Sequence, residues 1–189
     1  DRTCLYDRRN LGHSDTVDAV QTPDDALADL RGLLDAAGVE PPYVLLGASF
    51  GGMLAYLYAN TYPDEVVGMV LLDAMFPDEL TVDHLFPPEE RVEAFDEADK
   101  ASLERISHFA VLQQAQPFIG HEPAMPVTYL ASQQEPYDVN DYGIPEYDAQ
   151  ILDLQAGYVD RFSPGALVWV DAPHYMEPVI PSEIAEALR

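Results

Sequence analysis

The sequence predicts an α/β fold in which a mostly parallel sheet is flanked by helices. Apolar runs of strand length alternate along the chain with segments whose apolar residues recur at helical spacing. The run over residues 66–72 is apolar without alternation, as expected for a parallel strand that is covered on both faces. A glycine-rich turn at residues 47–52 joins an apolar strand to an apolar helix, which is the connection that such folds repeat.

Five strands are expected, near residues 3–6, 43–48, 66–72, 126–131 and 166–171. Because Cys4 lies inside the first of them, we expect it to be a buried, unreactive thiol. Helices are expected after Thr22, after the turn at 47–52, over residues 148–162 and from Pro181 onward. In the helix after Thr22, that residue is the expected N-cap, Asp25 takes the capping-box position, and Gly38 ends the helix in a left-handed conformation.

Residues 74–124 do not show the alternation of strands and helices. Several prolines interrupt the first part of this segment. Residues 88–116 then predict one or two amphipathic helices, because their apolar residues recur at helical spacing. The residues expected on the apolar side are Val92, Phe95, Leu103, Ile106, Phe109, Ala110 and Leu112.

Composition limits the possible functions. A chain of 189 residues can bury one good core, so a single domain over residues 1–189 is expected. The 34 acidic residues outnumber the 9 basic ones and give a net charge of −25. Such a charge repels nucleic acid and anionic membranes, and it disfavours anionic substrates. No apolar run is long enough to cross a bilayer, and nothing in the sequence identifies a compartment.

The turn after residues 43–46 carries the pattern Gly-x-Ser-x-Gly around Ser49. A strand before it and a helix after it form the context of a nucleophile elbow, in which a strained backbone lifts the serine hydroxyl out of the sheet. Side chains at positions 47 and 51 would collide with the turn, so glycine is expected at both. The Phe50 N–H lies at the helix start, where it could stabilise a developing oxyanion.

Several further motifs resemble those of the α/β-hydrolase superfamily, in its branch with a serine nucleophile. The first is residues 5–15, in which Asn10 replaces the usual glycine and is expected to keep the left-handed turn. Residues 62–66 and 70–73 resemble the end of the helix after the elbow and the strand that follows it. Residues 172–175 resemble the histidine loop. The resemblance implies that residues 75–124 form a small helical cap over the active site.

In this fold the catalytic residues follow the order serine, acid, histidine. Of the five histidines, only His174 follows a strand end near the C-terminus, so we expect it to be the base. The resemblance places the acid most often after the strand near 126–131, where Glu135 falls on its position. Asp138 could reach the site from a longer loop, and Asp73 matches a minority arrangement at the end of the preceding strand.

The expected function is therefore that of a serine hydrolase, a carboxylesterase that cleaves a small neutral ester through an acyl-enzyme. The sequence shows no metal-ligand cluster and no cofactor motif. The alternatives are a hydrolase-fold protein that binds a ligand without catalysis, an inactive fragment, and a cofactor-free perhydrolase or carbon–carbon hydrolase. Expected substrate-binding residues are Phe50, Phe76, Phe86, Phe109, Phe118 and Tyr175.

The resemblance also implies a longer sheet, because the superfamily's first three strands have no counterpart here and the sequence looks N-terminally truncated. One of them normally lies between the strands near 3–6 and 43–48. The loop that supplies the second oxyanion donor has no counterpart either. We expect a fragment of reduced activity whose first strand lies beside the elbow strand or one place away. A second copy that adds the strand, in a homo-oligomer, is the other possibility.

Overall fold

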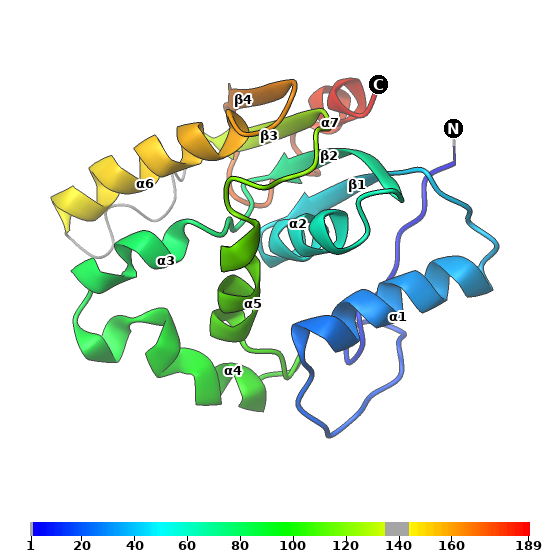
Figure 1. Ribbon diagram of the computed structural model, residues 1–189, viewed down its shortest axis with the longest axis horizontal. Coiled ribbons are helices and arrows are strands. Elements are labelled where there is room, and N and C mark those ends of the chain that lie inside the picture. Colours follow the sequence, from blue (N-terminus) through cyan, green and yellow to red (C-terminus); the bar gives the residue numbers. More distant parts are fainter. Residues whose placement is uncertain (1, 135–143) are drawn as a thin grey trace.

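The computed structural model describes residues 2–134 and 144–189 (Figure 1). Its centre is a sheet of four parallel strands in the order β1-β2-β3-β4. The strands are β1 (Tyr43–Ala48), β2 (Val66–Leu72), β3 (Val127–Ser132) and β4 (Gly165–Val170). Each lies within a residue or two of its expected position. The parallel sheet with helices against it confirms the predicted fold class.

Four helices outside residues 75–124 connect and cover the strands. They are α1 (Pro23–Ala36), α2 (Phe50–Thr61), α6 (Pro145–Val159) and α7 (Pro181–Ala187). The expected signals of α1 are confirmed, since the Thr22 hydroxyl accepts from the Asp25 N–H and the Asp25 carboxylate accepts from the Thr22 N–H. Gly38 has a φ of +61°, as expected for the residue that ends this helix. Among the described residues, no helix is both long and apolar enough to span a membrane.

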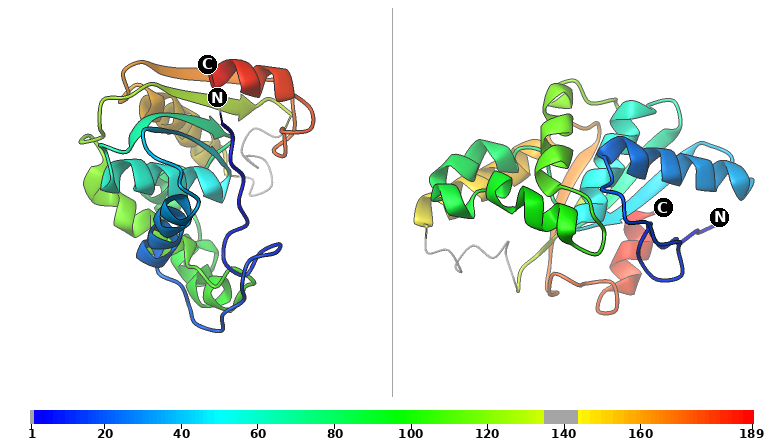
Figure 2. Two further views of the ribbon diagram at one scale, coloured as in Figure 1. Left: turned by 90° about the vertical axis from the view of Figure 1, so that its right-hand side faces the viewer. Right: turned by 90° about the horizontal axis from the view of Figure 1, so that it is seen from below.

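The prediction of a strand near residues 3–6 is wrong. Residues 2–7 form no regular secondary structure, Leu5 is 89% exposed, and Cys4 is exposed rather than buried. This segment runs toward the helical region instead of along the sheet (Figure 2), and Arg8 fixes it there through two hydrogen bonds to Glu104. A strand needs a neighbouring strand for its ladder of backbone hydrogen bonds. Residues 2–7 do not pair with β1, so β1 is an edge strand of the described sheet.

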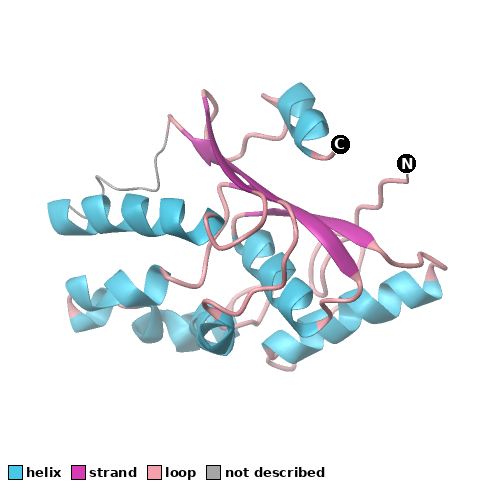
Figure 3. Ribbon diagram, turned by 45° about the horizontal axis from the view of Figure 1, so that its top comes forward, coloured by secondary structure: helices cyan, strands magenta, loops and turns pink. Residues whose placement is uncertain are grey.

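The two faces of the sheet are covered unequally (Figure 3). One face packs against α1, α2, α6 and the helices of residues 75–124 and holds the larger core. The other packs against α7, through Val70, Leu72, Leu130 and Val170 among others. Leu46 and Val168, which lie in register with Val70 and Leu130, and Val44, two residues before Leu46 on the same strand, stay 41–49% exposed. The second face is therefore only half covered.

The segment between β2 and β3, residues 75–124, folds as short helices that we call the cap region. It contains α3 (Glu79–Val82), α4 (Asp96–Ala101), α5 (His108–Ala115) and four short 3₁₀ turns. Ile106, Val111 and Leu112 are buried as an apolar face requires. Phe95 and Leu103 are 50% and 69% exposed, so the expected continuous apolar side is wrong there. The helices are shorter than predicted, and the chain changes direction between them.

Candidate active site

Ser49 occupies the sharp turn between β1 and α2. Its φ of +49° and ψ of −126° are unusual for a residue with a side chain, and such strain is typical of functional sites. The surrounding backbone holds the turn: the Ser49 N–H donates to the Leu72 carbonyl, and the Ser49 carbonyl accepts from the N–H groups of Gly52 and Met75. Neighbouring segments on both sides thus fix the conformation that the nucleophile elbow requires.

Two glycines make this turn possible, and one of them differs from our expectation. A Cβ at Gly47 would lie 2.6 Å from the Gly51 carbonyl oxygen, and a Cβ at Gly52 would lie 2.2 Å from the Ala74 side chain. Glycine is required at both positions. At Gly51, however, a Cβ would meet only the Arg8 side chain at an ordinary 3.5 Å. The predicted collision at position 51 is therefore wrong, and the tight contact belongs to position 52.

Asp73, directly after β2, is the described carboxylate that contacts His174. Its Oδ2 lies 2.8 Å from His174 Nδ1, and its Oδ1 accepts a hydrogen bond of 3.1 Å from the Ser132 N–H. Asp73 is only 3% exposed and has a φ of +40°. Because a carboxylate accepts at Nδ1, the neutral imidazole carries its proton there, and Nε2 is the nitrogen that can take another. Of the three acid candidates, Asp73 is the one that lies within the described residues.

His174 lies in the loop between β4 and α7, and Ser132 at the end of β3 holds that loop. The buried Ser132 hydroxyl donates to the Ala172 carbonyl at 2.7 Å, while its N–H binds Asp73. Ser132 therefore binds Asp73 directly and holds the histidine loop through Ala172. Sequence reasoning did not predict these contacts of Ser132. The preferred acid Glu135 and the alternative Asp138 lie outside the described residues.

The protein family described as "alpha/beta hydrolase fold" matches residues 2–107 of the chain, which is more than half of its length. The chain belongs to this family. Within this fold the strands run parallel. Their carboxyl ends therefore bring together Ser49, Asp73 and His174, which each follow a strand.

Solved structures show the same fold at low sequence identity. An N-acyl homoserine lactone degrading enzyme, Est816, is 18% identical, with a TM-score of 0.60 over 97% of this chain and 80% of its own. A thermophilic esterase from Thermogutta terrifontis is 21% identical, with a TM-score of 0.59 over 97% of this chain and 76% of its own. At these identities the likeness establishes the hydrolase fold, and the chemistry must be argued from the site.

A curated relative is closer in sequence over a shorter range. The uncharacterized protein YqjL from Bacillus subtilis (strain 168) is 38% identical over 85 residues, which is 45% of this chain. That match spans 33% of YqjL, and two further matches span 14% and 24% of their relatives. The chain thus matches a third or less of the length of these curated relatives.

A cavity of about 630 Å³ opens at the carboxyl ends of the strands, where Ser49 and His174 lie. Its lining comes from the strand ends, the cap region and α6, and it includes two of the expected substrate-binding residues, Phe86 and Tyr175. Phe76, Phe109 and Phe118 are not among its described lining. Phe76 is fully buried, with its ring 5.6 Å from that of Tyr158 in the core. Sequence reasoning missed His108, Phe95 and Tyr147, which line the cavity but follow no motif.

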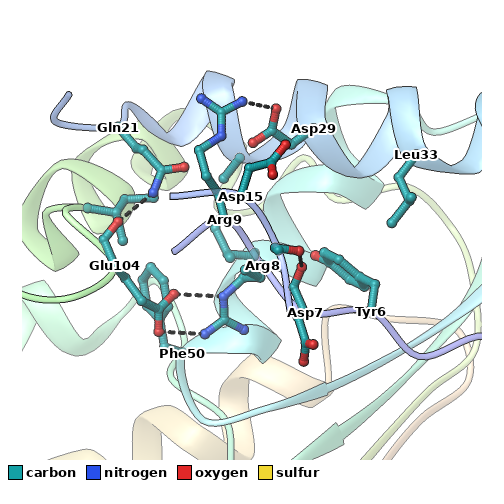
Figure 4. Close-up of a pocket in the computed structure, with 14 residues that line it drawn as sticks. Tyr6, Asp7, Arg8, Arg9, Asp15, Gln21, Asp29, Leu33, Phe50 and Glu104 are labelled. Atoms are coloured by element: carbon teal, nitrogen blue, oxygen red, sulfur yellow. Dashed lines mark hydrogen bonds and ion pairs between the residues drawn. The ribbon is translucent and has the colours of Figure 1, made fainter. Parts of the chain in front are cut away.

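Phe50 lies between this cavity and a second, smaller one. It is the first residue of α2, and N–H groups in the first turn of a helix lack acceptors within the helix. Its ring lies 4.5 Å from His108 and 5.7 Å from the Arg8 guanidinium. On the Arg8 side is a cavity of about 220 Å³ (Figure 4). The paired Arg8 and Glu104 form part of its wall, so Phe50 separates the two cavities.

Proposed function

We propose that this protein is a serine hydrolase that cleaves a carboxylic ester or a related acyl substrate through an acyl-enzyme. The observation that carries the proposal is the 2.8 Å contact between His174 Nδ1 and the buried Asp73, in a cavity that Ser49 also lines. A serine hydroxyl needs a base, and that base needs an orienting acid. This chemistry requires a serine, an acid and a histidine that share one cavity. The lining of this cavity includes all three, in the chain order Ser49, Asp73, His174.

In the proposed reaction, Ser49 Oγ attacks the acyl carbon while His174 Nε2 takes its proton. The negative charge that develops on the carbonyl oxygen is stabilised by the Phe50 N–H at the start of α2. The imidazolium then gives its proton to the leaving alcohol, and Ser49 keeps the acyl group. Water, activated by the same imidazole, releases the acid. Asp73 accepts the hydrogen bond from His174 Nδ1 and stabilises the imidazolium.

A fluorophosphonate probe tests this proposal, since it reacts with an activated serine. We expect stoichiometric labelling of the chain, hydrolysis of an aryl ester, and loss of both in Ser49→Ala. Loss of a catalytic nucleophile costs several orders of magnitude in rate. Ser182→Ala, at an exposed position of α7, is the matched control and should be labelled normally. Labelling that persists in Ser49→Ala would exclude Ser49 as the nucleophile, and a chain that is never labelled would favour ligand binding without catalysis.

A further inference from the structure

The cavity at Ser49 is unusually rich in carboxylates. Besides Asp73, its described lining includes Glu79, Asp83, Glu90 and Asp99, and it includes no lysine or arginine. Each of the four lies in the cap region, between β2 and β3 in the chain. A cleft lined by charge of one sign, with low-dielectric walls, concentrates ions of the other sign.

Three of these carboxylates are held in place by the backbone. Glu79 accepts from the Phe76 N–H at 2.8 Å, Asp83 from the Val92 N–H at 2.9 Å, and Asp99 from the His108 N–H at 3.0 Å. The carboxylates are part of how the cap region folds, so they do not swing away into solvent. Among the described residues, no three candidate ligands are gathered closely enough to hold a metal ion.

The basic side chains of the cap region do not neutralise this charge. Arg91 donates to the backbone carbonyls of Phe86 and His84. Lys100 pairs with Asp96 and Glu97, neither of which lines the cavity. Within the cap region, His108 lies near a lining carboxylate, with Nδ1 3.4 Å from Asp99. The cavity therefore keeps a net negative field.

Aromatic rings lie among the carboxylates. Phe86 and Tyr147 meet edge to face with ring centroids 4.7 Å apart, while Phe95 and Tyr175 are 50% and 76% exposed. The faces of aromatic rings attract organic cations, quaternary ammonium groups above all. Exposed rings on the lining of a cavity offer their faces to a ligand that enters it. The negative charge and the aromatic rings of the lining both favour an organic cation as the ligand.

We propose that the acyl substrate of this site carries a positive charge, as a protonated amine or a quaternary ammonium group, which the cap region binds. This inference rests on the proposed function, and it narrows the neutral ester expected from composition to a cationic one. The bond that breaks stays the acyl bond at Ser49, and the ammonium group gives binding and orientation.

Three thioesters of matched size test the proposal. Acetylthiocholine carries the cation, 3,3-dimethylbutyl thioacetate replaces its nitrogen by carbon, and S-acetyl-3-mercaptopropionate carries an anion. At low salt we expect kcat/KM to be about tenfold higher for the cation than for its neutral isostere, and lowest for the anion. The preference should shrink as NaCl screens it. Equal rates for the cation and its isostere, or a preference for the anion, would overturn the inference.

Substitutions that remove charge but keep an acceptor oxygen locate the effect. In the triple variant Asp83→Asn, Glu90→Gln, Asp99→Asn, the ratio of the two kcat/KM values should fall severalfold. The control Asp35→Asn, Glu40→Gln, Asp64→Asn also removes three negative charges, at exposed positions before β1 and β2. It should leave the ratio unchanged. An equal fall of the ratio in the triple variant and in the control would mean that the whole molecule's charge, and not the cavity, selects the cation.

Binding to the Ser49→Ala variant separates this inference from the proposed function. By nuclear magnetic resonance titration, choline should bind more tightly than 3,3-dimethylbutanol and shift the signals of residues that line the cavity. Tighter choline binding without hydrolysis of any ester would support the inference and overturn the proposed function. Ester hydrolysis by the unsubstituted chain, together with equal binding of choline and 3,3-dimethylbutanol, would support the proposed function and overturn the inference.

Discussion

The two sides of the main cavity are built in different ways. On the side of the sheet, Ser49, Asp73 and Ser132 follow strands and are fixed by backbone hydrogen bonds between neighbouring segments. On the side of the cap region, short helices and 3₁₀ turns present carboxylates and aromatic rings. We propose from this difference that the sheet side sets the rate of the proposed chemistry, while the cap side sets which substrates bind.

The largest effect is expected on the sheet side, at Asp73. Asp73→Asn keeps the size of the side chain but removes the charge that orients and stabilises the imidazole. We expect kcat to fall by about four orders of magnitude, as in other triads, with little change in KM. Stopped-flow or steady-state assays of an aryl ester measure this. Glu135→Gln is the matched control, and loss of activity there together with a normal Asp73→Asn would return the role to Glu135.

Ser132 should show a smaller effect of the same kind. Ser132→Ala removes the hydroxyl that donates to the Ala172 carbonyl but keeps the N–H that binds Asp73. We expect kcat to fall about tenfold with KM unchanged, and stability to fall by about 1–3 kcal/mol because a buried acceptor is left unpaired. The pH profile of kcat should shift as the histidine loop loosens. A loss of stability alone, with normal kinetics, would mean that Ser132 has no positioning role.

Substitution on the cap side should act on KM instead. Phe86→Leu removes the edge-to-face contact with Tyr147, and such contacts contribute about 1 kcal/mol. We expect KM for an aryl ester to rise about fivefold and kcat to stay within about twofold. Phe76→Leu is the control, because Phe76 is buried in the core away from the cavity. It should lower the melting temperature and leave KM unchanged, and the reverse pattern would contradict the division between the two sides.

The smallest effect is expected outside both sides, at the start of α1. Thr22→Ala should cost about 1 kcal/mol of stability without any change in kinetics. Hydrogen bonds from Thr22 lower the pKa of Asp25 below its ordinary value of 3.8. Because this pKa is lower in the folded state, its stabilisation is present at neutral pH and is lost as the pH falls through the lowered value. Chemical denaturation at pH 7 and pH 3 should therefore show the deficit narrowing in acid.

Local patterns predicted much of the fold. The capping residues of α1, the continuous apolar run of β2 and the strand–turn–helix around Ser49 each contain their own physical signal. The left-handed backbone at Asn10 was also predictable, and the structure gives it a φ of +69°. Its side chain accepts from the Val17 N–H, which holds the loop after the first segment.

The features that could not be predicted depend on contacts between distant segments. Residues 3–6 are apolar enough for a strand, but a strand also needs a neighbour, and Arg8 binds Glu104 instead. Asp73 was one of three acid candidates, and only the packing of β2 against β3 brings its carboxylate to His174. The collision expected at Gly51 lies at Gly52 for the same reason, because Ala74 comes from the following strand end.

The half-covered second face of the sheet has a consequence for the protein in concentrated solution. Val44, Leu46 and Val168 give neighbouring molecules an apolar surface to share, while a net charge of −25 pushes the molecules apart. The range of that repulsion shrinks to about 8 Å at physiological ionic strength, whereas the apolar attraction does not weaken with salt. We therefore expect added salt to lower the colloidal stability of this protein, which should stay dispersed best at low ionic strength.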